Sequence, residues 1–378
     1  AQPSYPGVTY PVDDQAFMRV ALALAEQGRY STSPNPCVGC VLIKDGAIVG
    51  RGYHRRAGQP HAEIVALSDA GDASRGATAY VTLEPCHHQG RTGPCTQALV
   101  DAGIVRVVYA LEDPNKLVAG RGGEFLTGAG LEVTKGICSA EASVLNAGFF
   151  KRMKTGRPLV RIKLAMSLDA CAALESGESQ WITGPQARAD VQRLRAQACV
   201  VLTGVGTVLA DNPSLTVRDA RFDMAGRQPR RVILDSTLRT PIGAKILALP
   251  GETLIFTGSA DATQTAALEQ AGAQVERIAE GRRPQLKGVF RRLAELEVNE
   301  ILVEAGPTLV GQCIDARCFD ELIIHLAPKL LGKRARRALD VDSPLQLADA
   351  AGLVLHTSEQ LGDDIALTFR PRDRETED

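Results

Sequence analysis

The chain has 378 residues, 44% of them hydrophobic, and a formal net charge of −1. This length favours two domains over one, and the neutral balance argues against a strongly basic nucleic-acid-binding protein. No apolar run approaches the roughly eighteen residues of a membrane span. The chain holds nine cysteines, an odd number that fits free thiols and metal ligands in a reducing cytoplasm better than a disulfide framework.

The first half of the chain alternates between helical and extended patterns. The Pro-rich opening, residues 1–12, shows no signal-peptide pattern and is predicted to be an N-terminal extension. Apolar residues then recur at helical spacing, and two apolar runs that meet at Asp45-Gly46 predict a hairpin. The order helix, hairpin, helix, strand, helix, strand is predicted over residues 13–29, 37–54, 62–70, 77–84, 95–103 and 106–113. Such alternation predicts a sheet with helices on its faces.

A basic segment that ends in proline, KRMKTGRP at 151–158, interrupts this pattern. We place the domain boundary there and expect a first domain over 13–157 and a second over 158–378. The second half contains a predicted helix over 189–197, and its apolar runs predict six strands, at 160–169, 199–206, 230–236, 252–258, 300–306 and 321–331. The second half is therefore also predicted to be α/β, with its own core.

The stretch from residue 60 to residue 95 has the composition of a catalytic zinc site. It holds His61-Ala-Glu63 at the start of a predicted helix, Cys86 after a proline, and Cys95 at the start of another helix. One histidine and two thiolates leave the fourth tetrahedral position open, which is typical of catalytic zinc. A zinc ion there would bring the pKa of water down to about 7, and Glu63 is well placed to move a proton to a leaving amine.

Other interpretations of the same residues remain open. Cys37 and Cys40 could join the other two cysteines in a closed structural zinc site. His87 and His88 are expected to line a polar pocket rather than to bind metal. RGYHRR at 51–56 is expected to be a solvated hairpin end, with a phosphate contact as the alternative. Zinc nucleobase deaminases carry H-x-E and P-C-x-x-C, whereas here eight residues separate Cys86 from Cys95. This chain therefore shares the residue types of the zinc nucleobase deaminases but not the spacing of their cysteines.

At these residues the chain resembles the bifunctional riboflavin-biosynthesis deaminase–reductase family. The resemblance extends from about residue 13 to about residue 370 and is carried by SPNPCVGCVL, PHAEIVAL, VTLEPCHHQGRTGPC, EDPNKLVAGRG, KLAMSLD, VEAGPTLVG and LAPKLLG. It implies a two-domain α/β protein, with an N-terminal cytidine-deaminase-like domain and a C-terminal dihydrofolate-reductase-like domain.

The resemblance also implies roles for the residues of the first domain. His61, Cys86 and Cys95 match the family's zinc ligands, Glu63 its proton shuttle and Asn35 a substrate-contacting asparagine. The implied reaction is the hydrolytic deamination of a diaminopyrimidinone that carries a ribosylamino 5′-phosphate. The long insert between the cysteines would then form a pocket for a small phosphorylated substrate.

Without the resemblance, the second half shows only glycine-bearing loops at strand ends, which could let a backbone approach a phosphate but fit ordinary turns better. The resemblance implies a reductase that uses NADPH to convert the ribosyl group to a ribityl chain. The implied cofactor positions are Ala165, Trp181, Thr207, Asp211, Ser236, Gly306, Pro307, Thr308, Leu309, Val310 and Gly311. The implied substrate positions are Lys163, Ser179, Arg195, Leu215, Arg218 and Glu304.

One departure from the family lies in the segment S-L-D-A-C, residues 167–171. The family has glycine where this chain has Ala170. If that glycine serves a turn with positive φ, Ala170 is strained there by roughly 1 kcal/mol.

The sequence thus predicts a cytoplasmic zinc hydrolase and NADPH-dependent oxidoreductase of riboflavin biosynthesis. We expect small phosphorylated pyrimidines as substrates, no nucleic-acid or membrane partner, and a homodimer or higher homo-oligomer. The alternatives are a nucleic-acid or nucleotide deaminase with an accessory domain, and a non-catalytic binding protein with a four-ligand structural zinc. The lack of an aromatic and basic stripe argues against nucleic acid.

Overall fold

The computed structural model describes residues 12–87, 93–114, 120–278 and 283–372. Residues 1–11 of the expected extension and His88 lie outside these ranges. The chain divides into two compact units, Ala1–Gly156 and Arg157–Asp378. The basic segment after residue 150 first completes a helix, which ends where Gly156 adopts a φ of 67°.

Unit 1 is built on a five-stranded sheet of order β2-β1-β3-β4-β5. The strands are β1 (Gly39–Lys44), β2 (Ala47–Tyr53), β3 (Thr78–Val81), β4 (Arg106–Tyr109) and β5 (Glu132–Lys135). Strand β1 runs antiparallel to β2 and β3, whereas β3, β4 and β5 are parallel to one another. The predicted hairpin turn is confirmed, since Asp45 and Gly46 both have positive φ, at 51° and 77°.

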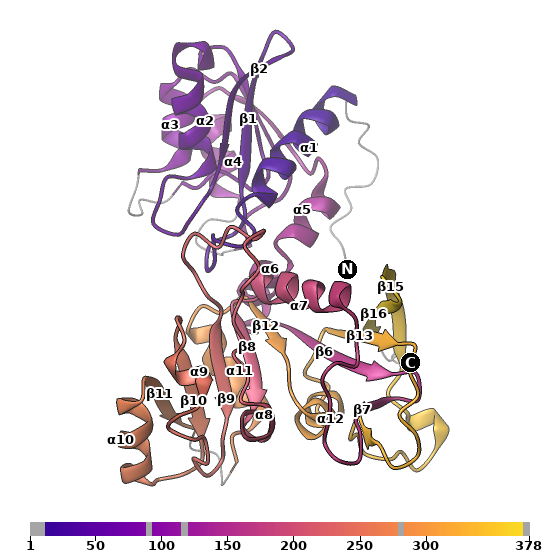
Figure 1. Cartoon of the computed structure of the whole chain (residues 1–378). Coiled ribbons are helices and arrows are strands. Elements are labelled where there is room, and N and C mark those ends of the chain that lie inside the picture. Colours follow the sequence, from indigo (N-terminus) through magenta and orange to yellow (C-terminus); the bar gives the residue numbers. More distant parts are fainter. Residues whose placement is uncertain (1–11, 88–92, 115–119, 279–282, 373–378) are drawn as a thin grey trace. The chain divides into compact units, whose positions relative to one another are not determined.

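Helices cover both faces of this sheet because alternate strand residues point to opposite sides. On β1, Val41 and Ile43 belong to one core cluster, and Cys40 and Leu42 to another. Figure 1 shows α1 on one side of the sheet and α2 and α3 on the other. The helices are α1 (Val12–Glu26), α2 (Ala62–Ala70), a 3-10 turn (Gly71–Ser74), α3 (Cys95–Asp101), α4 (Arg121–Gly128), α5 (Ser139–Leu145) and α6 (Ala147–Thr155).

Glycines on β2 allow helix α2 to approach the sheet unusually closely. A Cβ at Gly50 would lie 2.4 Å from the carbonyl oxygen of Ala66, and one at Gly52 would lie 2.2 Å from that of Ala62. Any larger residue would displace the helix. Since His61 and Glu63 lie at the first turn of α2, these glycines set the depth of both residues.

Unit 2 contains a nine-stranded sheet of order β11-β10-β9-β8-β12-β6-β13-β16-β15. It is parallel from β11 to β13, and β16 and β15 then continue it in antiparallel fashion. Its strands are β6 (Leu159–Ser167), β8 (Val200–Gly204), β9 (Arg230–Leu234), β10 (Thr253–Thr257), β11 (Ala273–Arg277), β12 (Glu300–Val303), β13 (Glu321–Ala327), β15 (Leu353–Leu361) and β16 (Asp364–Pro371). A separate pair consists of β7 (Cys171–Ala173) and β14 (Arg336–Arg337).

The helices of unit 2 pack on both faces of the large sheet. Core residues of α11 and α12 cluster with Val200 and Leu202 of β8, whereas Val201 of the same strand belongs to the cluster on the other face. The helices are α7 (Pro185–Gln197), α8 (Val205–Asp211), α9 (Lys245–Ala248), α10 (Ala262–Gln270), α11 (Leu286–Glu295), α12 (Pro307–Asp315) and a 3-10 turn (Leu347–Asp349). The glycine-bearing turn expected after the strand at 300–306 is therefore helix from Pro307 onward, because Gly306 and Pro307 start α12.

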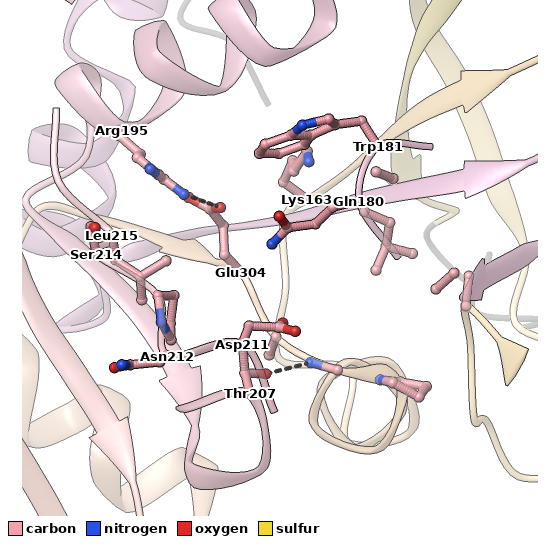
Figure 2. Close-up of a pocket in the computed structure, with 18 of the residues that line it drawn as sticks. Lys163, Gln180, Trp181, Arg195, Thr207, Asp211, Asn212, Ser214, Leu215 and Glu304 are labelled. Carbon is pink, nitrogen blue, oxygen red and sulfur yellow. Dashed lines mark hydrogen bonds and ion pairs between the residues drawn. The ribbon is translucent and has the colours of Figure 1, made fainter. Parts of the chain in front are cut away.

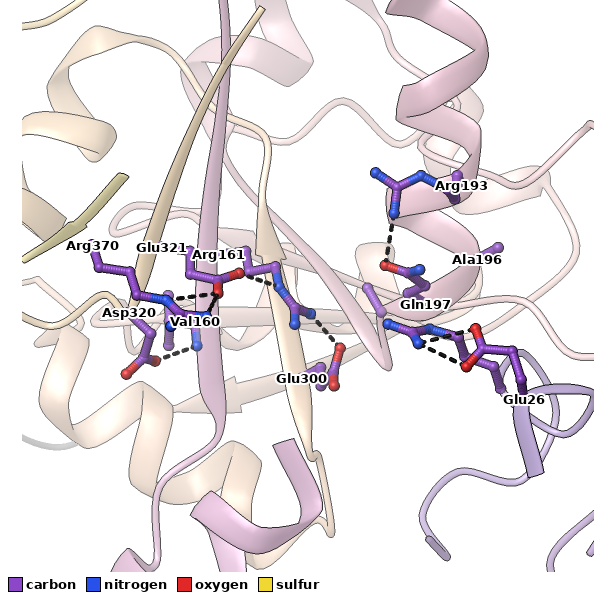
Figure 3. A network of polar contacts seen from close by, with 12 residues as sticks. Glu26, Val160, Arg161, Arg193, Ala196, Gln197, Glu300, Asp320, Glu321 and Arg370 are labelled. Atoms are coloured by element: carbon purple, nitrogen blue, oxygen red, sulfur yellow. Dashed lines mark hydrogen bonds and ion pairs between the residues drawn. The ribbon is translucent and has the colours of Figure 1, made fainter. Parts of the chain in front are cut away.

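A network of charges holds the central strand β6 between its neighbours (Figure 3). Arg161 forms ion pairs with Glu300 of β12 and with Glu321 of β13, the latter at 2.8 Å. Arg370 of β16 also reaches Glu321, at 2.8 Å. A slip of one residue would turn Arg161 to the other face and leave charges unpaired, so the network fixes the register.

Candidate functional site

The three predicted metal ligands of unit 1 converge. His61 is the N-cap residue of α2, Cys95 is the first residue of α3, and Cys86 lies in the segment that follows β3. Their ligand atoms all lie within 4.8 Å of one another. His61 Nδ1 is 3.3 Å from Cys95 Sγ and 3.5 Å from Cys86 Sγ. One imidazole nitrogen and two sulfurs are the donor set that zinc favours.

The surroundings of Cys86 favour its thiolate form. A hydrogen bond from Cys95 lowers the pKa of Cys86 to about 4, although burial opposes this shift. The backbone N–H of Cys95 also donates to Cys86 Sγ, at 3.5 Å. A thiolate is the form of cysteine that binds metal.

Glu63 lies beside this group without belonging to it. Its side chain is in the first turn of α2 and is only 3% exposed. Burial raises the pKa of Glu63 to about 7, and the charge on Cys86 adds to this rise. Such a carboxyl group exchanges protons readily near neutral pH, as a general acid–base residue must.

The closed four-cysteine alternative is wrong for the part of the chain that the structure describes. The metal-ligand group there contains neither Cys37 nor Cys40. Cys40 is fully buried on β1, and the Cys37 thiol contacts the hydroxyl of Thr32 at 3.4 Å. His87 also stays outside the ligand group, since its Nδ1 is hydrogen-bonded to Thr96 Oγ1 at 2.9 Å.

His54 belongs to this site although the sequence did not single it out. The expected solvated hairpin end is wrong at this position, because His54 is 3% exposed and its ring centroid is 5.3 Å from that of His61. Its Nδ1 donates to the carbonyl of Pro60 at 3.1 Å, so Nε2 accepts from Asn35 Nδ2 at 3.0 Å. The signal that could have found His54 is its place in an alternating pattern, since every second residue, Gly50, Gly52 and His54, is buried. The arginines on either side of these residues hide that pattern in the sequence.

Unit 2 contains a pocket of about 460 Å³ that gathers many of the residues implied for the reductase (Figure 2). Those that line it are Lys163, Ala165, Trp181, Arg195, Thr207, Asp211, Leu215, Arg218, Glu304, Gly306 and Pro307. The lining also includes residues that the sequence did not single out, among them Gln180, Asn212, Ser214, Lys245 and Ala338. Asn212 and Ser214 lie close to the implied positions Asp211 and Leu215, whereas Lys245 and Ala338 carry no motif signal.

A buried ion pair forms one wall of this pocket. Arg195 of α7 donates to both carboxylate oxygens of Glu304, at 2.6 and 2.8 Å (Figure 2). Burial alone would raise the pKa of Glu304, but the charge and hydrogen bonds of Arg195, together with the charge of Lys163, outweigh it and hold this pKa below its ordinary value. Arg195 Nη1 donates to the carbonyl of Thr216. Glu304 and Thr216 thus take up three of the five N–H donors of Arg195, and its implied role in substrate binding stays a prediction.

The remaining implied positions lie away from the pocket lining. Ser236 follows β9, where its carbonyl accepts a bond from Thr257 Oγ1 at 3.3 Å. Thr308 Oγ1 is 3.4 Å from Asp340 Oδ2, and a Cβ at Gly311 would lie 1.6 Å from the carbonyl oxygen of Asp340. Leu309, Val310 and Gly311 are buried within unit 2, and Ser179 is outside the lining as well. Their roles stay predictions.

The turn at Ala170 has the conformation that the sequence suggested. Ala170 has a φ of 59°, in the left-handed region that favours glycine. The preceding Asp169 accepts backbone N–H bonds from Leu331 and Gly332, so the turn is tied to the segment after β13. The strain expected at Ala170 is therefore present next to β6, the strand that carries Lys163 and Ala165.

Each unit of the chain matches a known protein family. Residues 11–111 match the cytidine and deoxycytidylate deaminase zinc-binding region, and residues 158–367 match the RibD C-terminal domain. Riboflavin biosynthesis protein RibD of Haemophilus influenzae is 47% identical over 95% of this chain and 98% of its own length. The Escherichia coli RibD is 46% identical over 94% and 99%.

Solved structures give the same result. Acinetobacter baumannii RibD, form 1, has a TM-score of 0.89 and 45% identity, and covers 95% of this chain and 99% of its own. A Thermotoga maritima deaminase/reductase has a TM-score of 0.84 and 32% identity at the same coverage. The chain therefore belongs to the RibD family of bifunctional deaminase–reductases of riboflavin biosynthesis.

Proposed function

We propose that this chain catalyses two consecutive steps on one phosphorylated pyrimidine. Unit 1 hydrolyses the amine of 2,5-diamino-6-ribosylamino-4(3H)-pyrimidinone 5′-phosphate and releases ammonia. Unit 2 then reduces the ribosyl group to ribityl with NADPH. The Thermotoga maritima relative is a diaminohydroxyphosphoribosylaminopyrimidine deaminase and 5-amino-6-(5-phosphoribosylamino)uracil reductase. The observation that carries the first step is the convergence of His61, Cys86 and Cys95 beside buried Glu63.

In unit 1, His61, Cys86 and Cys95 would hold zinc. Bound zinc supplies Lewis-acid chemistry that brings the pKa of water to about 7. Glu63 takes up a proton with a carboxylate oxygen and delivers it to the departing amine nitrogen. Asn35, held by His54 at 3.0 Å, binds the substrate in a fixed orientation.

In unit 2, the pocket residues would orient NADPH, which supplies the hydride. The start of α12 suits a cofactor phosphate, because backbone N–H groups at a helix N-terminus favour anions. Of these groups, the Gly306 N–H already donates to Thr207 Oγ1 at 3.2 Å. Glu304 accepts from ring N–H groups of the pyrimidine, and Arg195 and Arg218 contact its phosphate.

The remaining features of the proposal concern the whole protein. We place the deaminase in residues 13–157 and the reductase in 158–378, and we propose a cytoplasmic homodimer or higher homo-oligomer without a nucleic-acid partner. The nine cysteines, which all lie among the described residues, form no disulfide bond with one another. No helix among the described residues has the length and apolar character needed to cross a membrane.

The test is to supply purified full-length protein with the diaminopyrimidinone phosphate and to follow ammonia. Ammonia should appear with or without NADPH, and NADPH oxidation should start only after deamination. Release of ammonia from a single-stranded oligonucleotide, but not from the phosphorylated pyrimidine, would favour the nucleic-acid deaminase. X-ray absorption that shows four protein ligands on zinc would favour the binding protein.

A further inference from the structure

Glu84 lies two residues before the ligand Cys86 and is 3% exposed. Each of its carboxylate oxygens accepts two backbone N–H groups. Oε2 accepts from Asp113 at 3.2 Å and Gly120 at 3.0 Å, and Oε1 accepts from Gly122 at 2.9 Å and Gly123 at 3.2 Å. Residues 120–123 are the N-cap and first turn of α4. One buried side chain thus joins the metal-ligand segment to the start of this helix.

The glycines of this turn bring two backbones into direct contact. A Cβ at Gly122 would lie 2.2 Å from the carbonyl oxygen of Pro85, the residue between Glu84 and Cys86. A Cβ at Gly123 would lie 2.7 Å from the hydroxyl of Tyr109 on β4. Neither position accepts a side chain without movement, so the first turn of α4 holds the Cys86 segment at a fixed distance.

Helix α4 also contacts the residue on the other side of Cys86. The ring of His87 stacks on Phe125, with centroids 4.2 Å apart and planes inclined by 27°. The same imidazole is hydrogen-bonded to Thr96, the residue after Cys95, and the Thr96 N–H donates to the carbonyl of Cys86 at 3.2 Å. The segments of Cys86 and Cys95 are therefore linked through His87 and Thr96, and Phe125 of α4 packs against His87.

We propose that Glu84 is a positioning residue of the deaminase site. By binding the first turn of α4, its carboxylate sets the position of Cys86 Sγ relative to His61 and Cys95. The inference rests on the proposed metal-dependent deamination. Partners that orient metal ligands typically change metal affinity or activity by about 10–100-fold when they are removed.

Two variants disturb this contact from opposite sides. Glu84→Gln replaces one oxygen by an amide NH₂, which then faces two N–H donors in either orientation. Gly122→Ala leaves the carboxylate intact and pushes α4 away from Pro85. Matched controls lie in the same helix. Glu124→Gln removes an exposed carboxylate from the same turn, and Gly128→Ala adds a Cβ that meets no atom within 4 Å.

The experiment measures zinc affinity of the full chain by chelator competition and records the absorption spectrum of the cobalt-loaded protein. Both disturbing variants should bind zinc about 10–100-fold more weakly and shift the thiolate-to-cobalt band. NADPH oxidation by unit 2 on deaminated substrate should be unchanged, and both controls should match the wild type. If circular dichroism shows that Glu84→Gln does not fold, the zinc affinity and cobalt band of Gly122→Ala decide whether the contact positions Cys86.

Wild-type affinity and an unchanged cobalt band in Gly122→Ala and in any folded Glu84→Gln would overturn the positioning role. That outcome leaves the proposed function intact if the wild type binds metal and releases ammonia. A wild-type chain that binds neither zinc nor cobalt would instead overturn the proposed metal site itself, and the positioning role with it.

Discussion

Metal binding and proton transfer are assigned to different residues of the unit 1 site, and mutation should separate them. Cys86→Ser should lose zinc and deamination together, because serine is a poor zinc ligand. Glu63→Gln should keep zinc and lose deamination by about 10²–10⁴-fold, since general acid–base catalysis contributes that much. Zinc content by mass spectrometry and ammonia release are the two measurements. Near-normal ammonia release from the Glu63 variant would show that another group moves the proton.

The strain in the left-handed turn at Ala170 can be tested by mutation. Ala170→Gly should stabilise unit 2 by about 1 kcal/mol, because glycine adopts a φ of 59° without steric cost. The control Ala294→Gly, inside helix α11, should destabilise it by a similar amount. Urea unfolding of the full chain measures both. Equal loss of stability in the two variants would mean that the turn stores no strain.

Residue types with unusual chemistry were predictable from the sequence, and residues that act through packing were not. The proposed zinc ligands and Glu63 stand out because few structures require H-x-E and two later cysteines. His54 and Glu84 look ordinary, since their roles depend on partners distant in sequence, at Asn35 and at Gly120–Gly123. The ion pair of Arg195 with Glu304 could not be predicted either, because the two residues are far apart in the sequence.

Among the elements, helix α12 depends on a close contact that has no sequence signal. Gly311→Ala should destabilise unit 2 by roughly 1–3 kcal/mol, because the new Cβ would lie 1.6 Å from the carbonyl oxygen of Asp340. Gly288→Ala in α11 is the control, since its Cβ would be 3.7 Å from the nearest atom, in ordinary contact. In thermal melts, the unfolding midpoint should fall for Gly311→Ala and rise for Gly288→Ala. A Gly311 variant as stable as the wild type would show that the segment at 340 moves away freely.

Helix α1 is anchored to the sheet of unit 1 through an acidic group with a pH-dependent contribution. Buried Asp14 accepts bonds from Arg106 at 2.7 and 2.9 Å and from Tyr80 at 2.6 Å. Burial alone would raise the pKa of Asp14, but these bonds outweigh it and place this pKa below its ordinary value. The stabilisation is therefore complete above about pH 4, the ordinary aspartate pKa, and is lost as the pH falls through the lower folded value.

Asp14→Asn should accordingly weaken α1 by roughly 1.5–3 kcal/mol at neutral pH, and the difference from wild type should shrink toward pH 3. Hydrogen exchange of peptides from α1 and β4 measures this locally. Glu141→Gln, which removes an exposed partner of Arg19, should leave the exchange unchanged. A difference that stays constant from pH 7 to pH 3 would contradict the titration of Asp14.

Many elements followed from periodicity, but their lengths did not, and several strands and helices were not predicted, among them β5, β11, β15, β16, α10 and α11. The strands around 160, 200, 230, 253, 300 and 321 were predicted because buried parallel strands are continuous apolar runs. Helices α8 and α12 were missed, since each starts at a glycine-bearing turn directly after a strand. The register of β6 depends on Arg161 and its two glutamates, which no local pattern reveals.

For the whole molecule, the separate cores predict that each unit works alone. A fragment that begins at Arg157 should oxidise NADPH when supplied with deaminated substrate, because the described pocket lies entirely within unit 2. The full chain with Glu63→Gln serves as the control for reductase activity without deamination. A folded, correctly assembled fragment that leaves NADPH untouched would mean that unit 1 contributes to the reductase site.

The position of β6 in the middle of its sheet has a consequence for synthesis on the ribosome. This strand begins unit 2, yet its partners β12 and β13 are encoded more than a hundred residues later. At about 5–20 residues per second, its apolar edges wait on the order of ten seconds for those partners. Unit 1 has no such delay, because neighbouring strands of its sheet are at most two strands apart in the chain. Chaperone demand during translation should therefore concentrate on nascent chains between β6 and β13.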